Sequence, residues 1–355
     1  MMLGKHWMLR VTAWIVLFTL LTGCALADVY SDAGFIKKIP MKPKYTEDVE
    51  HHGSVVTLNY TTHAYALEAM ATGDYEICEA ANGETTLPEI PEGILPAAGE
   101  DILVEKTLYI YLPYGYDGLE DYNVLYLMHG GGEDESYWLG ENRMGKSTCK
   151  VLDRMVEKGE MAKTIIVCPT FYSFEGEPMD YTFASSAWPM YFWMELRNEV
   201  IPLVETTYAT YAHADVSEGN LIATREHRAF AGFSMGSATS LNSAMKHCLD
   251  ILAYVGSFSG SLTDPESFEK ALLDDKMQDM PVLFWYNGSG NADMAHDEHA
   301  AFYARILEDM PERFTDGENC CWVEFKGGTH AYNCWLPHLY NCLRLFFVTG
   351  TEADN

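Results

Sequence analysis

The sequence predicts an α/β fold in which a mostly parallel central sheet carries helices on both faces. Short apolar runs alternate with amphipathic segments along most of the chain, and this alternation is typical of successive β-α-β units. Several of the runs are apolar at every position, as expected for strands that are buried on both faces. The pattern contains neither an internal repeat nor a second domain. Residues 53–349 are therefore predicted to form one domain.

The order of the elements follows from the same pattern. Strands are expected at residues 54–60, 108–112, 124–128, 165–169, 229–231, 251–258, 282–286 and 322–325. Helices are expected at residues 148–159, 188–208, 237–245, 297–309 and 335–347. The run 124–128 is continuously apolar and is predicted to be a central strand. Residues 73–101 are rich in Glu, Gly and Pro and predict a long surface insertion.

The composition excludes some classes of function. In 355 residues, 23 Lys and Arg face 52 Asp and Glu, which gives a net charge of −29. Such a surface repels nucleic acids and anionic membranes and favours neutral ligands. The His and Cys residues do not have the spacing of a zinc site. We therefore expect neither a nucleic-acid partner nor a metal or other cofactor.

The first 27 residues are predicted to be an export signal, because Lys5 and Arg10 precede the short apolar run 11–21. Two cleavage sites compete. Residues 25–27 read A-L-A, a site for ordinary release, whereas L-T-G-C, ending at Cys24, resembles the lipobox of bacterial lipoproteins and is preferred. The protein is accordingly expected outside the cell or on its surface, with a membrane contact only through a lipid on Cys24. Residues 28–52 are expected to be a tether and residues 350–355 a tail.

Eight further cysteines leave two alternatives open. An exported protein can pair cysteines, and the four C-terminal ones allow one disulfide. The alternative is that all of them are buried free thiols. The eight are Cys78, Cys149, Cys168, Cys248, Cys320, Cys321, Cys334 and Cys342.

The motif around Ser234 predicts a nucleophile. An apolar run at 229–231 leads into G-F-S-M-G at 232–236, and a small-residue segment with helical character follows at 237–245. A serine on so sharp a strand-to-helix turn has a strained backbone, and the glycines two residues to either side leave room for the flanking chain. Ser234 is therefore expected to stand exposed at the end of a strand.

A second glycine-rich loop predicts an oxyanion hole. Residues 129–132 read H-G-G-G directly after the strand 124–128. Glycines at the end of a strand allow backbone N–H groups to turn toward a ligand. We expect the oxyanion donors to be the N–H groups of Gly130, Gly131 and Met235, the residue after the nucleophile.

An acid and a base follow Ser234 in the order that this kind of site requires. His330 lies on a glycine loop after the strand 322–325 and is expected to be the general base. Asp293 lies in the loop 287–293 after the preceding strand and is expected to orient the imidazole. Asp297 remains an alternative to Asp293.

With these residues in place, the chain resembles the esterase D-like α/β-hydrolases, and most closely the feruloyl and acetylxylan esterases of carbohydrate esterase family 1. The resemblance covers residues 53–348. It is carried by Y-L-P-Y-G-Y-D at 111–117, L-Y-L-M-H-G-G-G at 125–132, G-F-S-M-G at 232–236, and G-T-H at 328–330 with Trp335 five residues beyond. It implies the α/β-hydrolase fold and a serine esterase that forms an acyl-enzyme on Ser234 without a metal.

The expected substrate is a feruloyl ester on a plant cell-wall polysaccharide or oligosaccharide. An aromatic acyl group needs flat apolar walls, and four aromatic residues are candidates for them. These are Trp188, Tyr191, Trp193 and Trp335. The alternatives are an acetylxylan esterase, an acyltransferase or other small-ester hydrolase on the same fold, and a sugar-binding lipoprotein without activity.

Overall fold

The computed structural model describes residues 43–73, 75–78, 97, 99–173 and 187–348. The expected export signal, most of the tether, most of the insertion 73–101 and the C-terminal tail lie outside the described residues. The described part of the tether begins with a short helix, η1 (Pro43–Thr46).

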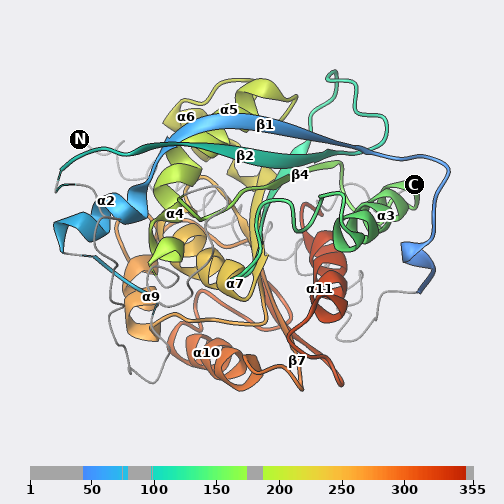
Figure 1. Ribbon diagram of the computed structural model, residues 1–355. Helices are drawn as coiled ribbons and strands as arrows, with labels where there is room; N and C mark the ends of the chain where they lie inside the picture. The colour runs from blue at the N-terminus through green and yellow to red at the C-terminus, as the bar shows by residue number, and fades with distance from the viewer. Residues whose placement is uncertain (1–42, 74, 79–96, 98, 174–186, 349–355) are drawn as a thin grey trace, which may run out of the picture.

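One sheet of eight strands organises the domain, in the order β1-β2-β4-β3-β5-β6-β7-β8 (Figure 1). The strands are β1 (Ser54–His63), β2 (Leu103–Leu112), β3 (Asn123–Met128), β4 (Thr164–Cys168), β5 (Arg228–Phe233), β6 (Tyr254–Phe258), β7 (Phe284–Gly290) and β8 (Cys320–Phe325). The first two strands pair antiparallel with each other, and β2 also pairs antiparallel with β4. All other neighbours are parallel. The predicted fold class is therefore confirmed.

An apolar layer lies on each face of the sheet, between the sheet and its helices. The layer under α3 and α11 contains Leu125 and Leu127, whereas the opposite layer contains Val124, Tyr126 and Met128. Because successive side chains of a strand point to opposite faces, residues 124–128 of β3 face both layers and are all apolar. The prediction of a central buried strand is therefore confirmed.

The helices divide between the two faces. Residues of α2, α4, α5, α9 and α10 enter one layer, and residues of α3 and α11 enter the other. Their bounds are α2 (Tyr65–Thr72), α3 (Arg143–Glu157), α4 (Trp188–Glu195), α5 (Ile201–Thr207), α6 (Glu218–Ala223), α7 (Met235–Thr239), α8 (Lys246–Cys248), α9 (Pro265–Leu272), α10 (His296–Asp309) and α11 (Tyr332–Leu345). The π-helical segments η2 (Leu196–Val200) and η4 (Ser240–Met245) and the 3-10 helix η3 (Arg225–His227) complete the chain.

Several predicted boundaries were wrong. Helix α3 begins five residues before the expected residue 148, because the side chain of Asn142 accepts a hydrogen bond from Gly145 N at 2.8 Å and caps the helix there. Strand β7 continues to Gly290, although residues 287–290 were expected to be loop. Residues 287–288 pair with both β6 and β8, and residues 289–290 pair with β8. This pairing outweighs the weak strand preference of glycine and asparagine.

The structure distinguishes the two alternatives for the cysteines. All eight cysteines from Cys78 to Cys342 are free thiols, and only Cys149 is not fully buried. Of the two alternatives, the structure therefore has the free thiols. No helix among the described residues combines the length and the apolar character that a bilayer span requires.

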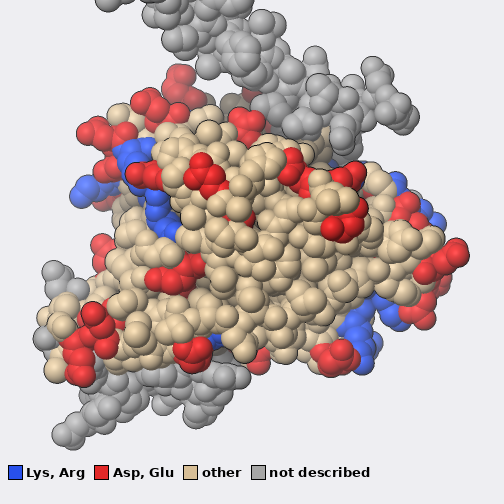
Figure 2. Space-filling model, turned by 90° about the horizontal axis from the view of Figure 1, so that it is seen from above, with Lys and Arg blue, Asp and Glu red and all other residues tan. Residues whose placement is uncertain are grey.

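Acidic side chains are scattered over the face of the molecule seen in Figure 2, and a broad central area of that face carries no charged side chain. On this face the acidic side chains are thus spread out rather than gathered in one patch. Lys and Arg lie toward the edges of the same view.

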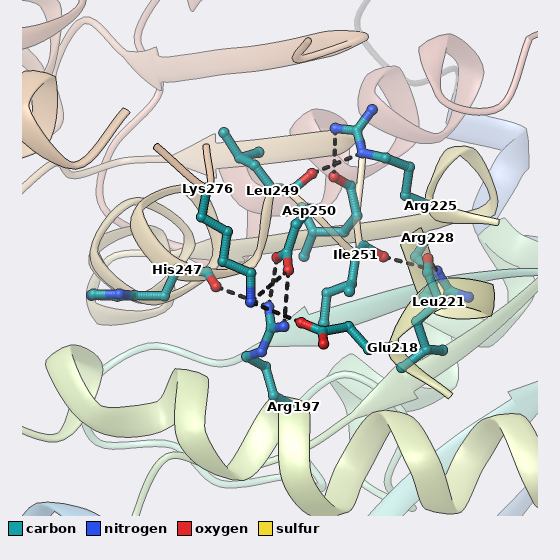
Figure 3. A network of polar contacts seen from close by, with 11 residues as sticks. Arg197, Glu218, Leu221, Arg225, Arg228, His247, Leu249, Asp250, Ile251 and Lys276 are labelled. Carbon is teal, nitrogen blue, oxygen red and sulfur yellow. Dashed lines mark hydrogen bonds and ion pairs between the residues drawn. The ribbon is translucent and has the colours of Figure 1, made fainter. Parts of the chain in front are cut away.

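A network of charged side chains around the buried Asp250 holds the turn between α8 and β6 (Figure 3). Asp250 is fully buried and accepts hydrogen bonds from Arg197 at 2.5 and 2.9 Å. Lys276 lies 3.0 Å from the same carboxylate. Burial raises the pKa of Asp250, but the hydrogen bonds from Arg197 and Lys276 outweigh burial, so its pKa lies below its ordinary value. Asp250 therefore remains ionised at neutral pH.

Two more buried arginines bind the backbone nearby. Arg225 donates to the carbonyl groups of Leu249, Leu252 and Pro281 at 2.8 to 2.9 Å. Arg228, the first residue of β5, pairs with the buried Glu205 at 2.7 Å and donates to Ile251 O at 2.9 Å. These bonds anchor both ends of the turn that brings the chain from the nucleophile segment into β6.

We predict that Asp250→Asn lowers the free energy of unfolding by about 3 kcal/mol at pH 7, because it leaves two cations without their buried counter-ion. A carboxylate whose pKa is depressed in the folded state stabilises the fold above its unfolded pKa of about 4 and loses this contribution as the pH falls below it. The difference between the two proteins should therefore shrink in acid. Urea unfolding at pH 7 and pH 3.5 measures both effects.

The control is Glu120→Gln, which breaks the exposed ion pair with Lys163 and should cost less than about 1 kcal/mol. Equal losses in the two variants at pH 7 would contradict a structural role for the buried network.

Candidate active site

Ser234 lies on a strained turn directly after β5. Its φ of 54° and ψ of −119° are rare for a residue with a side chain, and such strain costs about 1–3 kcal/mol. Its N–H donates to Phe258 O at 2.8 Å, and its carbonyl accepts the first hydrogen bond of α7, from Ala238 N at 3.0 Å. The turn is thus fixed by β6 on one side and by the helix on the other.

The flanking glycines are sterically required, as the motif predicted. A Cβ atom on Gly232 would lie 2.5 Å from Gly236 O, and one on Gly236 would lie 2.4 Å from His129 O. The backbones of the strand, the turn and the H-G-G-G loop are therefore in direct contact. No room is left for a side chain at Gly232 or Gly236. The expectation that a side chain would collide here is confirmed.

Three side chains form one line of hydrogen bonds at the carboxyl ends of the strands. His330 Nε2 lies 3.0 Å from Ser234 Oγ, and His330 Nδ1 lies 2.8 Å from Asp293 Oδ1. The alternative acid, Asp297, is fully exposed and pairs instead with His296 Nδ1 at 2.8 Å. The structure thus brings Asp293, and not Asp297, to the imidazole.

Glycines bring the loops of Asp293 and His330 together. A Cβ atom on Gly290 would lie 2.2 Å from Gly328 O, and Ala292 N donates to that same carbonyl at 2.9 Å. Asp293 N then donates to Gly290 O at 3.0 Å, so the aspartate lies on a tight turn at the end of β7. Backbone contact between the two loops fixes the distance between acid and base.

Asp293 is held in its ionised form. Burial raises its pKa, but hydrogen bonds from His330 and from the N–H of Ala295, together with the influence of the nearby Ser259 hydroxyl, outweigh burial and lower the pKa of Asp293 below its ordinary value. An anion at this place keeps the Nδ1 proton on the carboxylate side of the ring and leaves Nε2 free to accept a proton from Ser234.

The loop that contains Gly130 and Gly131 is fixed by a buried histidine that sequence reasoning missed. Burial lowers the pKa of His129 to about 4, so the ring is neutral. Its Nδ1 lies 2.7 Å from Gly130 O and its Nε2 lies 2.8 Å from Thr170 Oγ1. The neutral ring therefore donates to the Gly130 carbonyl and accepts from the threonine.

This loop lies beside the nucleophile. A Cβ atom on Gly130 would lie 2.4 Å from the ring of Phe233, the residue before Ser234. Gly132 N donates to the hydroxyl of Tyr172 at 3.0 Å. Met235, the other expected donor, is the first residue of α7 and is partly buried. Gly130 and Met235 thus lie on either side of the turn of Ser234. The oxyanion role of Gly130, Gly131 and Met235 stays a prediction.

Glu133 is a further residue that the sequence did not single out. It follows the H-G-G-G loop, and its Oε2 atom is buried with no hydrogen-bond partner among the described residues. Burial raises the pKa of Glu133 to about 7, although the charge of His330 acts in the opposite direction. The position directly after a glycine loop was the only signal in the sequence.

The four aromatic candidates lie at different depths. Trp335 stacks on Phe233 with ring centroids 3.9 Å apart and meets the His330 ring edge-on at 5.1 Å. Trp188 is buried against Tyr172 at 4.8 Å. Tyr191 and Trp193 lie on α4, where Tyr191 accepts a hydrogen bond from Glu76 N at 2.7 Å and Trp193 stacks on His247 at 4.7 Å.

The described geometry therefore places one of the four, Trp335, against the triad. Trp188, Tyr191 and Trp193 make the contacts given above with residues that pack on or beside α4. A role for these three in substrate binding stays a prediction.

Residues 101–344 match the Esterase family. The chain belongs to this family. The resemblance stated from the sequence motifs is thereby confirmed.

Two curated relatives are named as xylanases, and one of them is also named as a feruloyl esterase. The chain is 39% identical over 252 residues to endo-1,4-beta-xylanase Y of Acetivibrio thermocellus, which is 68% of this chain and 22% of the relative. It is 28% identical over 171 residues to an endo-1,4-beta-xylanase/feruloyl esterase of Xylanibacter ruminicola, 46% of this chain and 21% of the relative. The chain thus spans about a fifth of the length of these relatives.

Solved structures show the same fold. A mutant feruloyl esterase module from Clostridium thermocellum in complex with sinapinate superimposes with a TM-score of 0.63 at 25% identity, over 87% of this chain and 93% of that one. A ferulic acid esterase of family CE1 from Anaeromyces mucronatus gives a TM-score of 0.59 at 21% identity, over 86% and 96%. The latter likeness supports the fold alone.

We predict that Glu133→Gln changes the pH dependence of stability. A carboxyl group whose pKa is raised from 4.5 to about 7 in the folded state destabilises the fold as the pH rises through that window, because ionisation is easier in the unfolded chain. Glutamine carries no such penalty. The melting temperature of the variant relative to wild type should therefore be higher at pH 8 than at pH 5.

The control is Asp134→Asn at the next residue, whose carboxylate is exposed and bonded to Ser136. This variant should show no relative gain at pH 8. Parallel melting curves of wild type and Glu133→Gln across the pH range would contradict the buried, uncharged carboxyl group.

Proposed function

We propose that the chain is a serine esterase that hydrolyses feruloyl esters on plant cell-wall polysaccharide. The observation that carries the proposal is the line of hydrogen bonds from Ser234 Oγ through His330 to Asp293, in a chain of the Esterase family. The relatives named as xylanases and feruloyl esterases support the choice of ester. Trp335, whose ring lies beside His330, supports an aromatic acyl or sugar group at the site.

The mechanism follows from the roles that we assign to these residues. Ser234 Oγ attacks the ester carbonyl while His330 Nε2 takes its proton, and the tetrahedral intermediate carries its negative charge toward the N–H groups of Met235, Gly130 and Gly131. His330 then returns the proton to the leaving sugar oxygen, and the acyl group remains on Ser234. A water molecule, deprotonated by His330, hydrolyses the acyl-enzyme and releases the acid.

The strained turn contributes to this reaction. Because the φ of Ser234 is fixed by backbone contacts before substrate arrives, no ordering of the nucleophile is needed during the reaction. The neutral His129 holds the Gly130 peptide in place in the same way. Both devices keep the oxyanion donors and the nucleophile in fixed positions relative to each other.

We further propose that the enzyme works outside the cell as a lipoprotein anchored through Cys24. The polysaccharide cannot enter the cell, and the first 24 residues end in L-T-G-C. Mass spectrometry of the protein purified from the membranes of a bacterial host tests this; a mature chain that begins at Asp28 instead would favour ordinary release.

Hydrolysis of methyl ferulate and of acetylated xylan by the purified mature chain tests the activity. We expect ferulate release by the wild type and a loss of at least about a thousandfold in Ser234→Ala, because the covalent step is removed. Ser240→Ala is the matched control: its hydroxyl is buried in η4 and bonds Gly236 O and Gly256 O, so activity should remain. Acetate release alone would overturn the choice of ester, and no release of either acid would overturn the hydrolase.

Asp293→Asn and Asp297→Asn distinguish the two acids. The first should lower kcat by about 10³- to 10⁴-fold, because an asparagine neither fixes the tautomer of His330 nor stabilises the imidazolium. Asp297→Asn should change kcat by less than about twofold, because Asp297 does not contact the imidazole of His330. The opposite ranking would contradict the assignment of Asp293.

A further inference from the structure

Ser259 lies at the floor of the proposed triad. It directly follows β6, between β5, which ends at the nucleophile, and β7, which leads to Asp293. Its side chain is fully buried, and its N–H donates to Gly288 O at 2.8 Å. The next residue, Gly260, lies so close to Ser234 that an added Cβ atom would be 3.3 Å from Ser234 O.

Two buried oxygen atoms in this floor lack a completed hydrogen bond. Both His330 and the N–H of Ala295 bind Oδ1 of Asp293, whereas Oδ2 is buried with no partner among the described residues. Ser259 Oγ is also buried without a partner there. A buried carboxylate oxygen without a donor costs stability, and a serine hydroxyl that can rotate about χ1 is a donor of the right kind.

A second observation connects the two side chains. The N–H of Ser259 bonds Gly288 near the end of β7, and the N–H of Asp293 bonds Gly290, the last residue of the same strand. The hydroxyl of Ser259 is also among the causes that lower the pKa of Asp293. The bond is not closed in this conformation of the side chain.

The backbone of Ser259 is strained in the manner of a functional residue. Its φ is 56°, a left-handed conformation that costs a residue with a Cβ atom about 1 kcal/mol or more relative to glycine. A glycine would serve the backbone better at this place. A serine at this position therefore indicates a role for its hydroxyl group.

We propose that Ser259 is a positioning residue whose hydroxyl donates a hydrogen bond to Asp293 Oδ2. This bond fixes the plane of the carboxylate, so that Oδ1 keeps facing His330 Nδ1 through the reaction. The inference rests on the proposed serine hydrolase mechanism, and it does not depend on which ester is the natural substrate.

The other titratable groups near Asp293 do not replace this donor. Burial lowers the pKa of His299 and of His338 to about 3, so both rings are neutral. His299 accepts from Gly260 N at 3.2 Å and lies 3.2 Å from Asn287 Oδ1, and His338 lies 2.9 Å from the hydroxyl of Tyr286. Burial raises the pKa of the Cys334 thiol to about 12, so it is also uncharged. His330 is then the one titratable partner bonded to Asp293 among the described residues.

Ser259→Ala and Ser259→Gly test the proposal together, with p-nitrophenyl acetate and methyl ferulate as substrates. Both variants remove the hydroxyl, but only glycine relieves the positive φ, so Ser259→Gly should melt at a higher temperature than Ser259→Ala. If the hydroxyl positions Asp293, both should lose kcat by roughly tenfold, with KM changed by less than about twofold.

The pH profile supplies a readout that a packing effect would not move. A carboxylate with one hydrogen bond fewer is more basic and stabilises the imidazolium beside it more strongly, so the acid limb of kcat/KM should move to higher pH in both variants. Ser257→Ala is the matched control, because Ser257 is equally buried on β6 and its Oγ accepts from Trp285 Nε1 at 3.3 Å. Its profile should coincide with that of the wild type.

The outcomes separate this inference from the proposed function. Wild-type hydrolysis with unchanged kcat and acid limb in both Ser259 variants overturns the inference alone. Recovery of kcat in Ser259→Gly but not in Ser259→Ala would assign the loss to backbone strain, and an equal loss in Ser257→Ala would assign it to packing; either result overturns the positioning role. A wild type that hydrolyses neither ester overturns the proposed function and this inference with it.

Discussion

The strained turn at Ser234 is the constraint on which the rest of the site depends. A serine with a φ of 54° persists only where the surroundings leave it no alternative. Here the carbonyl of Phe258 holds its N–H, the first turn of α7 holds its carbonyl, and the backbone of the H-G-G-G loop fills the space beside Gly236. The buried ion pairs of Arg197 and Arg228 fix the ends of the segment that leaves this turn and returns as β6.

Close backbone contact recurs wherever the chain has to bring distant residues together. Ser234 and His330 are 96 residues apart in sequence, yet their side chains lie 3.0 Å from each other. The approach is possible because Gly290 and Gly328 touch without side chains. Parallel strands end at one edge of the sheet, so loops after β5, β7 and β8 meet there. The sheet brings these loops to one edge, and the contact between Gly290 and Gly328 sets the distance between the loops of Asp293 and His330.

Burial governs the electrostatics of the site. It keeps the rings of His129 and His299 neutral, so they act as fixed hydrogen-bonding groups and not as charges. Asp293 remains an anion only because several donors offset its burial. A single ionised carboxylate facing His330 among neutral neighbours gives the imidazole one defined orientation. This arrangement suits proton transfer at one nitrogen atom.

The sequence by itself determined the α/β class, the central strand 124–128, the steric need for the glycines around Ser234 and the family, because these depend on local periodicity and on short motifs. It left Asp293 and Asp297 as alternatives, placed the end of β7 too early and did not single out His129, Glu133 or Ser259. Those properties depend on which atoms meet across the sheet. Only the tertiary structure decided that Asp293 faces the imidazole, because strand pairing and the contact of the two glycine loops fix that distance, and neither is encoded in local spacing.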